Sequence, residues 1–287
     1  MLLIGLTGSL ATGKSTVSNI LRSAPYDLPI IDADLLARQV VEPGTYGYSK
    51  VVKAFGPTTP DLLLPPPKPD GEGEASEKDS GQEADHLEKR DKSRPINRAV
   101  LGRRVFGSTP DRVRDRKVLN GIIHPLVRLA IAKAILYHYV RGYWAVVLDI
   151  PLLFESGLDI FCGVVVMVAV RDAEVQMQRL RERDSGLSAQ EAEERVGSQM
   201  QVMEKVERTI FRGPRKGVVI YNDGTMNDLR DEIDVAIKRV ESQGGGTWKR
   251  VWLWGSPLAV FIFALWEIIL SYSARRRFGQ NRRKRSS

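Results

Sequence analysis

The residues best suited to chemistry form a glycine-containing loop near the N-terminus. Residues 8–15 read GSLATGKS, which has the spacing of a Walker A phosphate loop. Glycines let successive backbone N–H groups point at phosphate oxygens, and the helix that follows adds the positive end of its dipole. The lysine of such a loop reaches the β- and γ-phosphates, and the next hydroxyl binds Mg²⁺. The loop predicts a site for ATP formed by Gly8, Ser9, Leu10, Ala11, Thr12, Gly13, Lys14, Ser15 and Thr16.

Two acidic residues, Asp32 and Asp34, follow the second short apolar run of the chain. In an extended chain both carboxylates point to the same side, and one of them could accept the proton of a hydroxyl substrate. The alternative is structural, because Asp34 precedes an apolar-periodic stretch and suits a helix N-cap. Beside a phosphate loop, we favour a functional role for at least one of the two.

A third acidic residue, Asp149, ends the third apolar run and is followed by PLLFE. A Walker B acid near Mg²⁺ would sit at this position, and a capping role at the end of a strand is the alternative. The expected Mg²⁺ ligands are therefore Ser15 with Asp149 or Asp32.

Further candidates follow later in the chain. Arg179, Arg181, Arg183 and Arg195 are of the type that closes over phosphates during transfer, although a solvated helix face explains any single one of them as well. Asn222, in YNDG, could read the adenine edge or simply form a turn. His124 precedes Pro125 at the expected start of a helix, which by itself favours a structural role.

These residues need a scaffold of strands and helices. Five apolar runs, 2–7, 29–32, 143–149, 163–170 and 217–221, are typical of buried parallel strands. Helical patterns cover 15–21, 98–106, 111–120, 126–140, 173–183 and 228–240, with Asp172 as an N-cap and a capping box at 188–191. Strands alternating with helices predict an α/β fold with a parallel sheet.

Two segments fall outside this pattern. Residues 57–94 begin with prolines and continue as a Gly, Glu, Asp, Ser and Lys mixture, which predicts a disordered insertion; a docking loop is the alternative. Residues 251–272 are apolar, have tryptophans at one end and basic residues on both sides, and are long enough to cross a bilayer as a helix. A buried C-terminal helix is the alternative, and Glu267 and Pro257 weaken the spanning case.

The charge of the chain belongs to its C-terminal end. Residues 249–287 hold nine lysines and arginines against one acidic residue, so the formal net charge of +8 lies there and the body is neutral. This argues against nucleic acid as a partner. We expect a body at 1–241, a linker at 242–250, a transmembrane helix at 251–272 and a basic tail at 273–287. The body would be cytosolic, held at the mitochondrial outer membrane or the endoplasmic reticulum.

Taken together, these segments resemble the dephospho-CoA kinase family. The most specific one is IDADLLARQVVEPGTYGY; the phosphate loop, LNGIIHPLVR, LDIPLLFESGL, QRLRERD, VGSQM and YNDG stand in the family's order. The resemblance covers residues 1–56 and 95–241. The chain departs from it at residues 9–11, where members are usually richer in glycine, and at 211–217.

The resemblance implies a P-loop kinase core of five parallel strands, a helical acceptor-binding region and a lid. It implies ATP-dependent phosphorylation of the ribose 3′-hydroxyl of dephospho-CoA, the last step of coenzyme A synthesis. Asp34 would be the base, Lys14 and Ser15 would serve ATP and Mg²⁺, Arg179 would be the lid arginine, and Asn222 would contact the nucleotide base. The acceptor would be bound by Asp32, Asp34, His124, Pro151, Leu152, Leu153 and Glu155.

Three other classes of protein fit this sequence less well. Another small-molecule kinase on the same core fits the IDAD and His-Pro segments less well. A regulatory GTPase would read guanine with Asn-Lys-x-Asp, and no asparagine here precedes a lysine. A membrane-tethered adaptor without activity is disfavoured by the retention of Lys14, Ser15 and Asp34. A docking partner from the coenzyme A pathway remains open.

Overall fold

The structure is a computed structural model, and it describes residues 1–65, 94–183, 202–254, 269, 272–273 and 276–280. The chain divides into two compact units. One consists of Met1–Asp32 and Ile135–Ser287, and the other of Ala33–Ala134.

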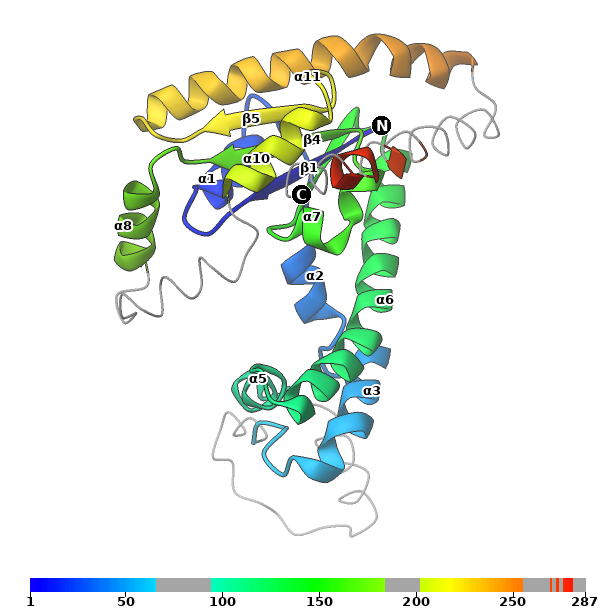
Figure 1. Cartoon of the computed structure of the whole chain (residues 1–287). Helices are drawn as coiled ribbons and strands as arrows, with labels where there is room; N and C mark the ends of the chain where they lie inside the picture. Colours follow the sequence, from blue (N-terminus) through cyan, green and yellow to red (C-terminus); the bar gives the residue numbers. More distant parts are fainter. Residues whose placement is uncertain (66–93, 184–201, 255–268, 270–271, 274–275, 281–287) are drawn as a thin grey trace, which may run out of the picture. The chain divides into compact units, whose positions relative to one another are not determined.

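The first unit is built on a five-stranded parallel sheet (Figure 1). Its strands are β1 (Leu2–Gly8), β2 (Ile30–Asp32), β3 (Ala145–Asp149), β4 (Val164–Ala169) and β5 (Gly217–Tyr221), in the spatial order β2-β3-β1-β4-β5. The central strands β3 and β4 are buried along their whole length, because helices cover both faces of the sheet. The predicted α/β fold is confirmed, and each predicted strand lies within two residues of the observed one.

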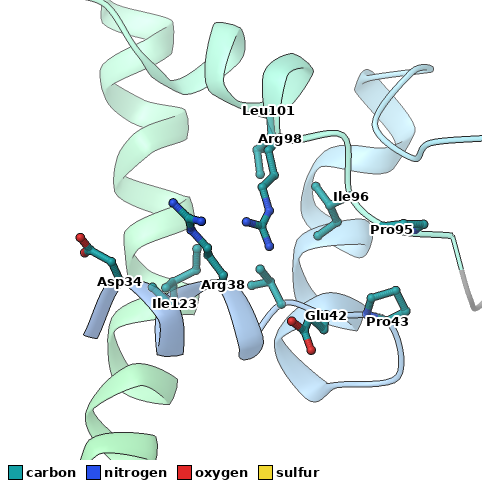
Figure 2. A pocket seen from close by; sticks show the side chains of 11 residues that line it. Asp34, Arg38, Glu42, Pro43, Pro95, Ile96, Arg98, Leu101 and Ile123 are labelled. Atoms are coloured by element: carbon teal, nitrogen blue, oxygen red, sulfur yellow. The ribbon is translucent and has the colours of Figure 1, made fainter. Parts of the chain in front are cut away.

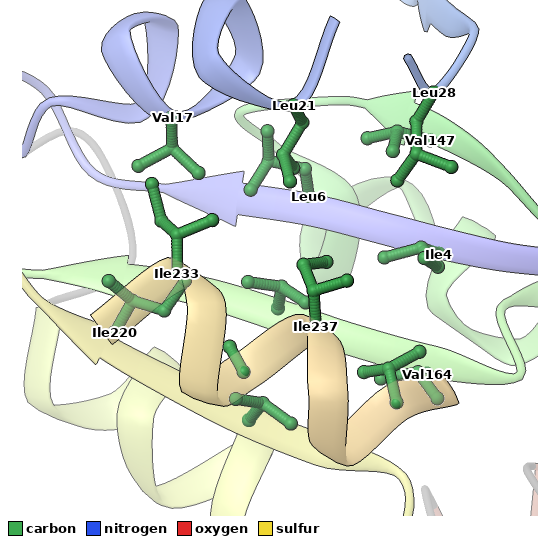
Figure 3. Close-up of a cluster of buried hydrophobic side chains, with 14 of the residues drawn as sticks. Ile4, Leu6, Val17, Leu21, Leu28, Val147, Val164, Ile220, Ile233 and Ile237 are labelled. Carbon is green, nitrogen blue, oxygen red and sulfur yellow. The ribbon is translucent and has the colours of Figure 1, made fainter. Parts of the chain in front are cut away.

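One face of the sheet packs on α1 (Lys14–Arg22) and on α11 (Met226–Trp254) (Figure 3). Ile4 and Leu6 of β1 meet Val17 of α1 and Ile233 and Ile237 of α11 in one buried cluster. This packing fixes the start of α1 directly after the phosphate loop.

The helices of the opposite face are α7 (Leu153–Ser156) and α10 (Val202–Phe211), with the 3₁₀ turn η2 (Leu158–Phe161) between α7 and β4. Val206 of α10 packs on Met167 and Ala169 of β4. A side chain at Gly5 of β1 would lie 2.7 Å from both the Cys162 sulfur and Leu153, so the close approach on this face requires glycine. Helix α8 (Ala173–Arg183) follows β4, and Asp172 caps it by accepting a hydrogen bond from the Glu174 N–H at 2.8 Å, as predicted.

The second unit is helical. It contains α2 (Ala33–Gln39), α3 (Tyr46–Phe55), η1 (Gly56–Thr58), α5 (Arg98–Val105) and most of α6 (Pro110–Val140). Side-chain oxygens cap the starts of two of these helices. The Thr45 hydroxyl accepts a hydrogen bond from the Tyr48 N–H at the start of α3, and the Asn97 side chain accepts one from the Val100 N–H at the start of α5. Its core consists of Tyr48, Val51, Phe55, Leu62, Ile96, Leu101, Val105 and Leu119.

Two helices are longer than the sequence predicts. The expected break at residues 121–125 was wrong, because α6 is continuous and holds Pro125 in its interior. A proline removes one backbone hydrogen bond but still fits a long helix whose other bonds continue. The glycine-rich segment 243–247, predicted to be part of a linker, lies inside α11.

The ends of the predicted insertion are ordered, so its boundaries were wrong. Leu62 is 1% exposed and belongs to the core of the second unit. Leu63 forms a bridge with Ile96, and the Arg94 Nε donates to the Leu64 carbonyl at 2.8 Å. Residues 66–93, for which the prediction of disorder stands untested, lie outside the described residues.

Within the described part of the chain, α6 is the one helix whose length and composition would allow it to cross a membrane. Its apolar stretch is little buried, and this is weak evidence for a span. Most of the segment 251–272, the predicted transmembrane helix, lies outside the described residues, as does the capping box at 188–191.

Candidate active site

The candidate site begins where three neighbouring strands end. In the register of the sheet, Asp149 of β3 pairs with Leu6 of β1 on one side and with Asp32 of β2 on the other. The phosphate loop follows β1 directly, at Gly8. Because the carboxyl ends of parallel strands share one edge, the loop and two of the predicted acids meet there.

The phosphate loop turns through two left-handed residues. Ala11 has φ 58° and Gly13 has φ 90°, and the Thr12 hydroxyl donates to the Ser9 carbonyl at 3.0 Å. Helix α1 begins at Lys14 without a side-chain cap, so its first N–H groups remain available to an anion.

The Lys14 ammonium lies 2.5 Å from an Asp149 carboxylate oxygen. The two side chains are 16% and 7% exposed, which places this ion pair at the mouth of the loop and largely out of water. The predicted Walker B position, Asp149, therefore lies beside Lys14, the lysine that the sequence predicts to bind phosphate.

The loop fits a phosphate group. Among the described residues, the Ser9 hydroxyl is one of the few buried polar groups that have no hydrogen-bond partner. A buried donor of this kind needs an acceptor, and a phosphate oxygen is one. The hydroxyl of Ser15, in the first turn of α1, is exposed.

Side chains from two later segments hold the loop from outside. Gln176 of α8 donates to the Leu10 carbonyl at 2.6 Å, and Asn222 after β5 donates to the Thr12 carbonyl at 3.0 Å. The Arg179 guanidinium donates to the Asn222 backbone carbonyl at 2.8 Å. Asn222 therefore contacts the phosphate loop directly, and Arg179 lies beside it through its bond to Asn222. The sequence interpretation missed Gln176, a buried polar residue whose position on the inner face of a helix could have been noticed.

The segment after β3 is fixed at its first turn. The Pro151 carbonyl accepts from the Thr7 hydroxyl at 3.0 Å and from the Lys205 ammonium at 3.1 Å. Leu152 is half exposed, whereas Leu153 is fully buried in the core. Lys205 is a second residue that the sequence interpretation missed.

A pocket of about 390 Å³ lies within the second unit (Figure 2). Asp34 lines it, from the first turn of α2. The extended geometry assumed for the Asp32–Asp34 pair was wrong, because β2 ends at Asp32 and a helix starts at Ala33. His124 does not line this pocket, although its neighbour Ile123 does.

The pocket combines charges with an apolar wall. Arg38 of α2 and Arg98 of α5 extend their guanidinium groups into the same space in Figure 2. The remaining lining residues are Ala37, Val41, Glu42, Pro43, Pro95, Ile96 and Leu101. Such a pocket suits an elongated ligand with an anionic part and an apolar part.

The order β2-β3-β1-β4-β5 and a phosphate loop after β1, with an acid at the end of β3, define a P-loop kinase. The sequence pattern of one known family, described as dephospho-CoA kinase, matches residues 2–63 and 89–228. The chain belongs to the dephospho-CoA kinase family.

Individual relatives agree with this assignment. The chain is 40% identical to the dephospho-CoA kinase CAB5 of Saccharomyces cerevisiae over 241 residues, which cover 84% of this chain and 83% of that protein. It is 34% identical to a dephospho-CoA kinase of Oryza sativa subsp. japonica, over 87% of this chain and 88% of the relative. A dephospho-CoA kinase structure from Campylobacter jejuni superposes with a TM-score of 0.55 at 25% identity, covering 85% of this chain and 98% of that one.

Proposed function

We propose that the chain transfers the γ-phosphoryl group of ATP to the ribose 3′-hydroxyl of dephospho-CoA, giving coenzyme A and ADP. The observation that carries this proposal is the Lys14–Asp149 pair at the end of β3, in a chain of this family. The 3′-oxygen forms a bond to the γ-phosphorus while the bond to the β,γ-bridging oxygen breaks. The hydroxyl proton goes to a carboxylate, for which we propose Asp34.

The phosphate loop binds the donor. Its backbone N–H groups and the start of α1 face the phosphates, and Lys14 exchanges part of its contact with Asp149 for the β- and γ-phosphate oxygens. Gln176 and Asn222 keep the loop carbonyls turned away from the anion by bonding them. Arg179, half-buried against Asn222, is the proposed lid arginine, and the Asn222 side chain is the proposed contact for the adenine.

Carboxylate and hydroxyl oxygens are the ligands that Mg²⁺ takes in proteins, and Ser15 with Asp149 or Asp32 supplies them at this edge of the sheet. The ion would neutralise charge on the transferred group and the leaving group.

The pocket of the second unit is the proposed acceptor site. Arg38 and Arg98 suit the diphosphate of dephospho-CoA, and the apolar wall of Val41, Ile96 and Leu101 suits its pantetheine arm. Asp34 lines the edge of the same pocket, with its carboxylate pointing away from Arg38 and Arg98 in Figure 2, and we propose that the acceptor hydroxyl lies on that side. His124 and residues 151–155 stay further candidates for acceptor contacts.

The experiment is a product assay on the full-length chain in mild detergent. With ATP, Mg²⁺ and dephospho-CoA, we expect coenzyme A to form, phosphorylated at the ribose 3′ position by NMR. Lys14→Ala is the matched control and should lose at least about a hundredfold in turnover. ATP hydrolysis without coenzyme A would reject the proposed acceptor.

We propose further that the C-terminal segment attaches the enzyme to an intracellular membrane, the mitochondrial outer membrane or the endoplasmic reticulum. In one geometry residues 252–272 span the bilayer; in the other, the segment bends at Pro257 and both flanks stay on the cytosolic side. The described residues support the second geometry. The Phe278 ring packs edge-on against Phe211 of α10, with ring centroids 5.3 Å apart, so the chain beyond the apolar segment contacts the kinase body.

Labelling separates the two geometries. The native Cys162 is 1% exposed and burial raises the pKa of its thiol to about 12, so an added cysteine can be labelled selectively. Ser287→Cys should react with an impermeant maleimide in intact membranes, as should the exposed control Ser49→Cys. Labelling of Ser287→Cys only after detergent would favour a span. A full-length protein extracted by alkaline carbonate would reject membrane insertion altogether.

A further inference from the structure

Helix α10 presents a row of cations to the segment that follows β3. Lys205, Arg208 and Arg212 recur at intervals of three and four residues, which places the first two on one face of the helix and the third in the turn directly after it. Figure 1 shows α10 lying next to α7, and the ion pair between Lys205 and Glu155 joins the two helices. Arg212 bonds Asp159 at 3.3 Å and the Cys162 carbonyl at 2.9 Å, so this end of the row holds the turn before β4.

Lys205 differs from the two arginines in what it holds. Its side chain is fully buried, and its ammonium lies 3.0 Å from a Glu155 carboxylate oxygen and 3.1 Å from the Pro151 carbonyl. A buried ammonium is costly unless it is paired, and an apolar side chain of similar size is often as stable at such a position. The stability of the fold therefore does not by itself require a lysine here.

The two partners of Lys205 lie in the segment that directly follows the Asp149 strand and is hydrogen-bonded to the strand before the phosphate loop. The Pro151 carbonyl also accepts from Thr7, the residue before Gly8 of the phosphate loop. Pro151 stands two residues after Asp149, which pairs with Lys14. One carbonyl oxygen thus joins three segments: the strand that enters the phosphate loop, the turn that leaves the Asp149 strand, and α10.

We propose that Lys205 is a positioning residue for phosphoryl transfer, which sets the turn at Pro151–Glu155 against the phosphate loop through one carbonyl and one carboxylate. The inference rests on the proposed function, in which residues 151–155 are candidates for contacts with the acceptor. Because Lys205 is fully buried, its proposed action passes through the turn and not through contact with a substrate. It fixes the backbone after Asp149 and the direction of Glu155, so its loss loosens the acceptor side of the site more than the nucleotide side.

The test compares Lys205→Met with Lys205→Arg and with Arg212→Met. Methionine keeps most of the volume and removes the charge, and arginine restores a cation that donates to both oxygens. Arg212→Met is the control, since it removes a buried cation from the turn directly after the same helix, where it bonds Asp159 and the Cys162 carbonyl and not Pro151 or Glu155. For each variant, kcat, KM for dephospho-CoA, the dissociation constant for ATP and the Tm are measured.

Lys205→Met should lower kcat/KM for dephospho-CoA at least about tenfold, with ATP affinity within about threefold of wild type. Lys205→Arg should recover part of this loss. Arg212→Met should lower the Tm while kcat and KM stay near wild type. An unchanged kcat/KM in Lys205→Met, or a loss that Arg212→Met reproduces, would overturn the inference.

Glu155→Gln covers the case in which Lys205→Met does not fold. It keeps the shape of the partner and removes its charge, and it should shift KM for dephospho-CoA in the same direction by a smaller factor. A near-normal KM for dephospho-CoA in Glu155→Gln would reject a positioning role for the ion pair. A wild-type protein inactive on dephospho-CoA would instead reject the proposed function, so the two failures are distinguishable.

Discussion

Replacing Gly13 by alanine should disable nucleotide binding for two separable reasons. Gly13 has φ 90°, a left-handed conformation that costs a residue with a side chain about 1–2 kcal/mol. In addition, an alanine Cβ would lie 2.2 Å from the Asn222 side-chain nitrogen. Asn222 would have to turn away and give up its hydrogen bond to the Thr12 carbonyl, which costs about 0.5–1.5 kcal/mol more.

The two costs together set the expected magnitude. With the steric clash against Asn222 included, we expect the free energy of ATP binding to become less favourable by about 2–4 kcal/mol. This corresponds to an ATP dissociation constant that is roughly 30- to 700-fold higher. The Asn222→Ala variant loses this hydrogen bond together with the proposed adenine contact, and the hydrogen bond by itself predicts at least about a 2- to 12-fold effect. Isothermal titration of ATP into each purified variant measures both values.

The double variant tests the cause. The Gly13→Ala/Asn222→Ala variant keeps the backbone strain at residue 13 but has no Asn222 side chain to clash with. Each single variant loses the same hydrogen bond to the Thr12 carbonyl, so the sum of the two single losses counts that bond twice, whereas the double variant loses it once. We expect the double variant to fall short of additivity by about 0.5–1.5 kcal/mol. Gly142→Ala is the strain-only control, because Gly142 has φ 77° and an added Cβ would meet nothing within 4 Å. It should lower the Tm and leave ATP affinity unchanged. Additive losses, or an ATP affinity in Gly13→Ala within twofold of wild type, would refute the reasoning.

The remaining predictions concern catalysis, the insertion and the thiol. Asp34→Asn should lower turnover at least about a hundredfold at saturating substrates, because it removes the proton acceptor; near-normal turnover would exclude this base. Replacing residues 67–92 by a short flexible linker should keep activity within a few-fold, whereas Leu62→Ala in the adjoining core should cost about 2–5 kcal/mol of stability in denaturant titrations. If the deletion instead abolished cooperative melting, the segment would belong to the core. Cys162, whose pKa burial raises to about 12, should resist alkylation at pH 8 in the native protein and react readily in urea; fast native labelling would contradict its burial.

The strands and the phosphate loop were predictable because each depends on local sequence. Short apolar runs bounded by turn residues identify the five strands, and β5 was predicted with its observed ends, Gly217–Tyr221. Helix α8 was also predicted with its observed ends and its cap at Asp172. These signals lie within a few residues of the elements that they specify.

The contacts across the site were not predictable to the same degree. Nothing in the sequence near Gln176 shows that its amide meets Leu10, or that Lys205 meets Pro151, because these pairs are set by how strands order in the sheet. Pro125 was given too much weight as a helix start, since a long helix accommodates one missing hydrogen bond. Composition also placed the start of the predicted insertion too early in the chain. Leu62 stands among prolines, yet it packs in the core of the second unit.

The continuity of α11 changes how an attached membrane would act on the enzyme. The helix packs on the sheet through Val240 and continues as helix to Trp254, about 21 Å further at 1.5 Å per residue. A glycine-rich coil of this length would let the catalytic body diffuse around its attachment point and sample all orientations. A helical arm transmits torque instead, so the body would face the lipid surface with a set side and at a set height. Substrate access would then depend on which edge of the sheet points away from the bilayer, and lengthening the arm by two residues, about 200° of helical rotation, would present a different edge.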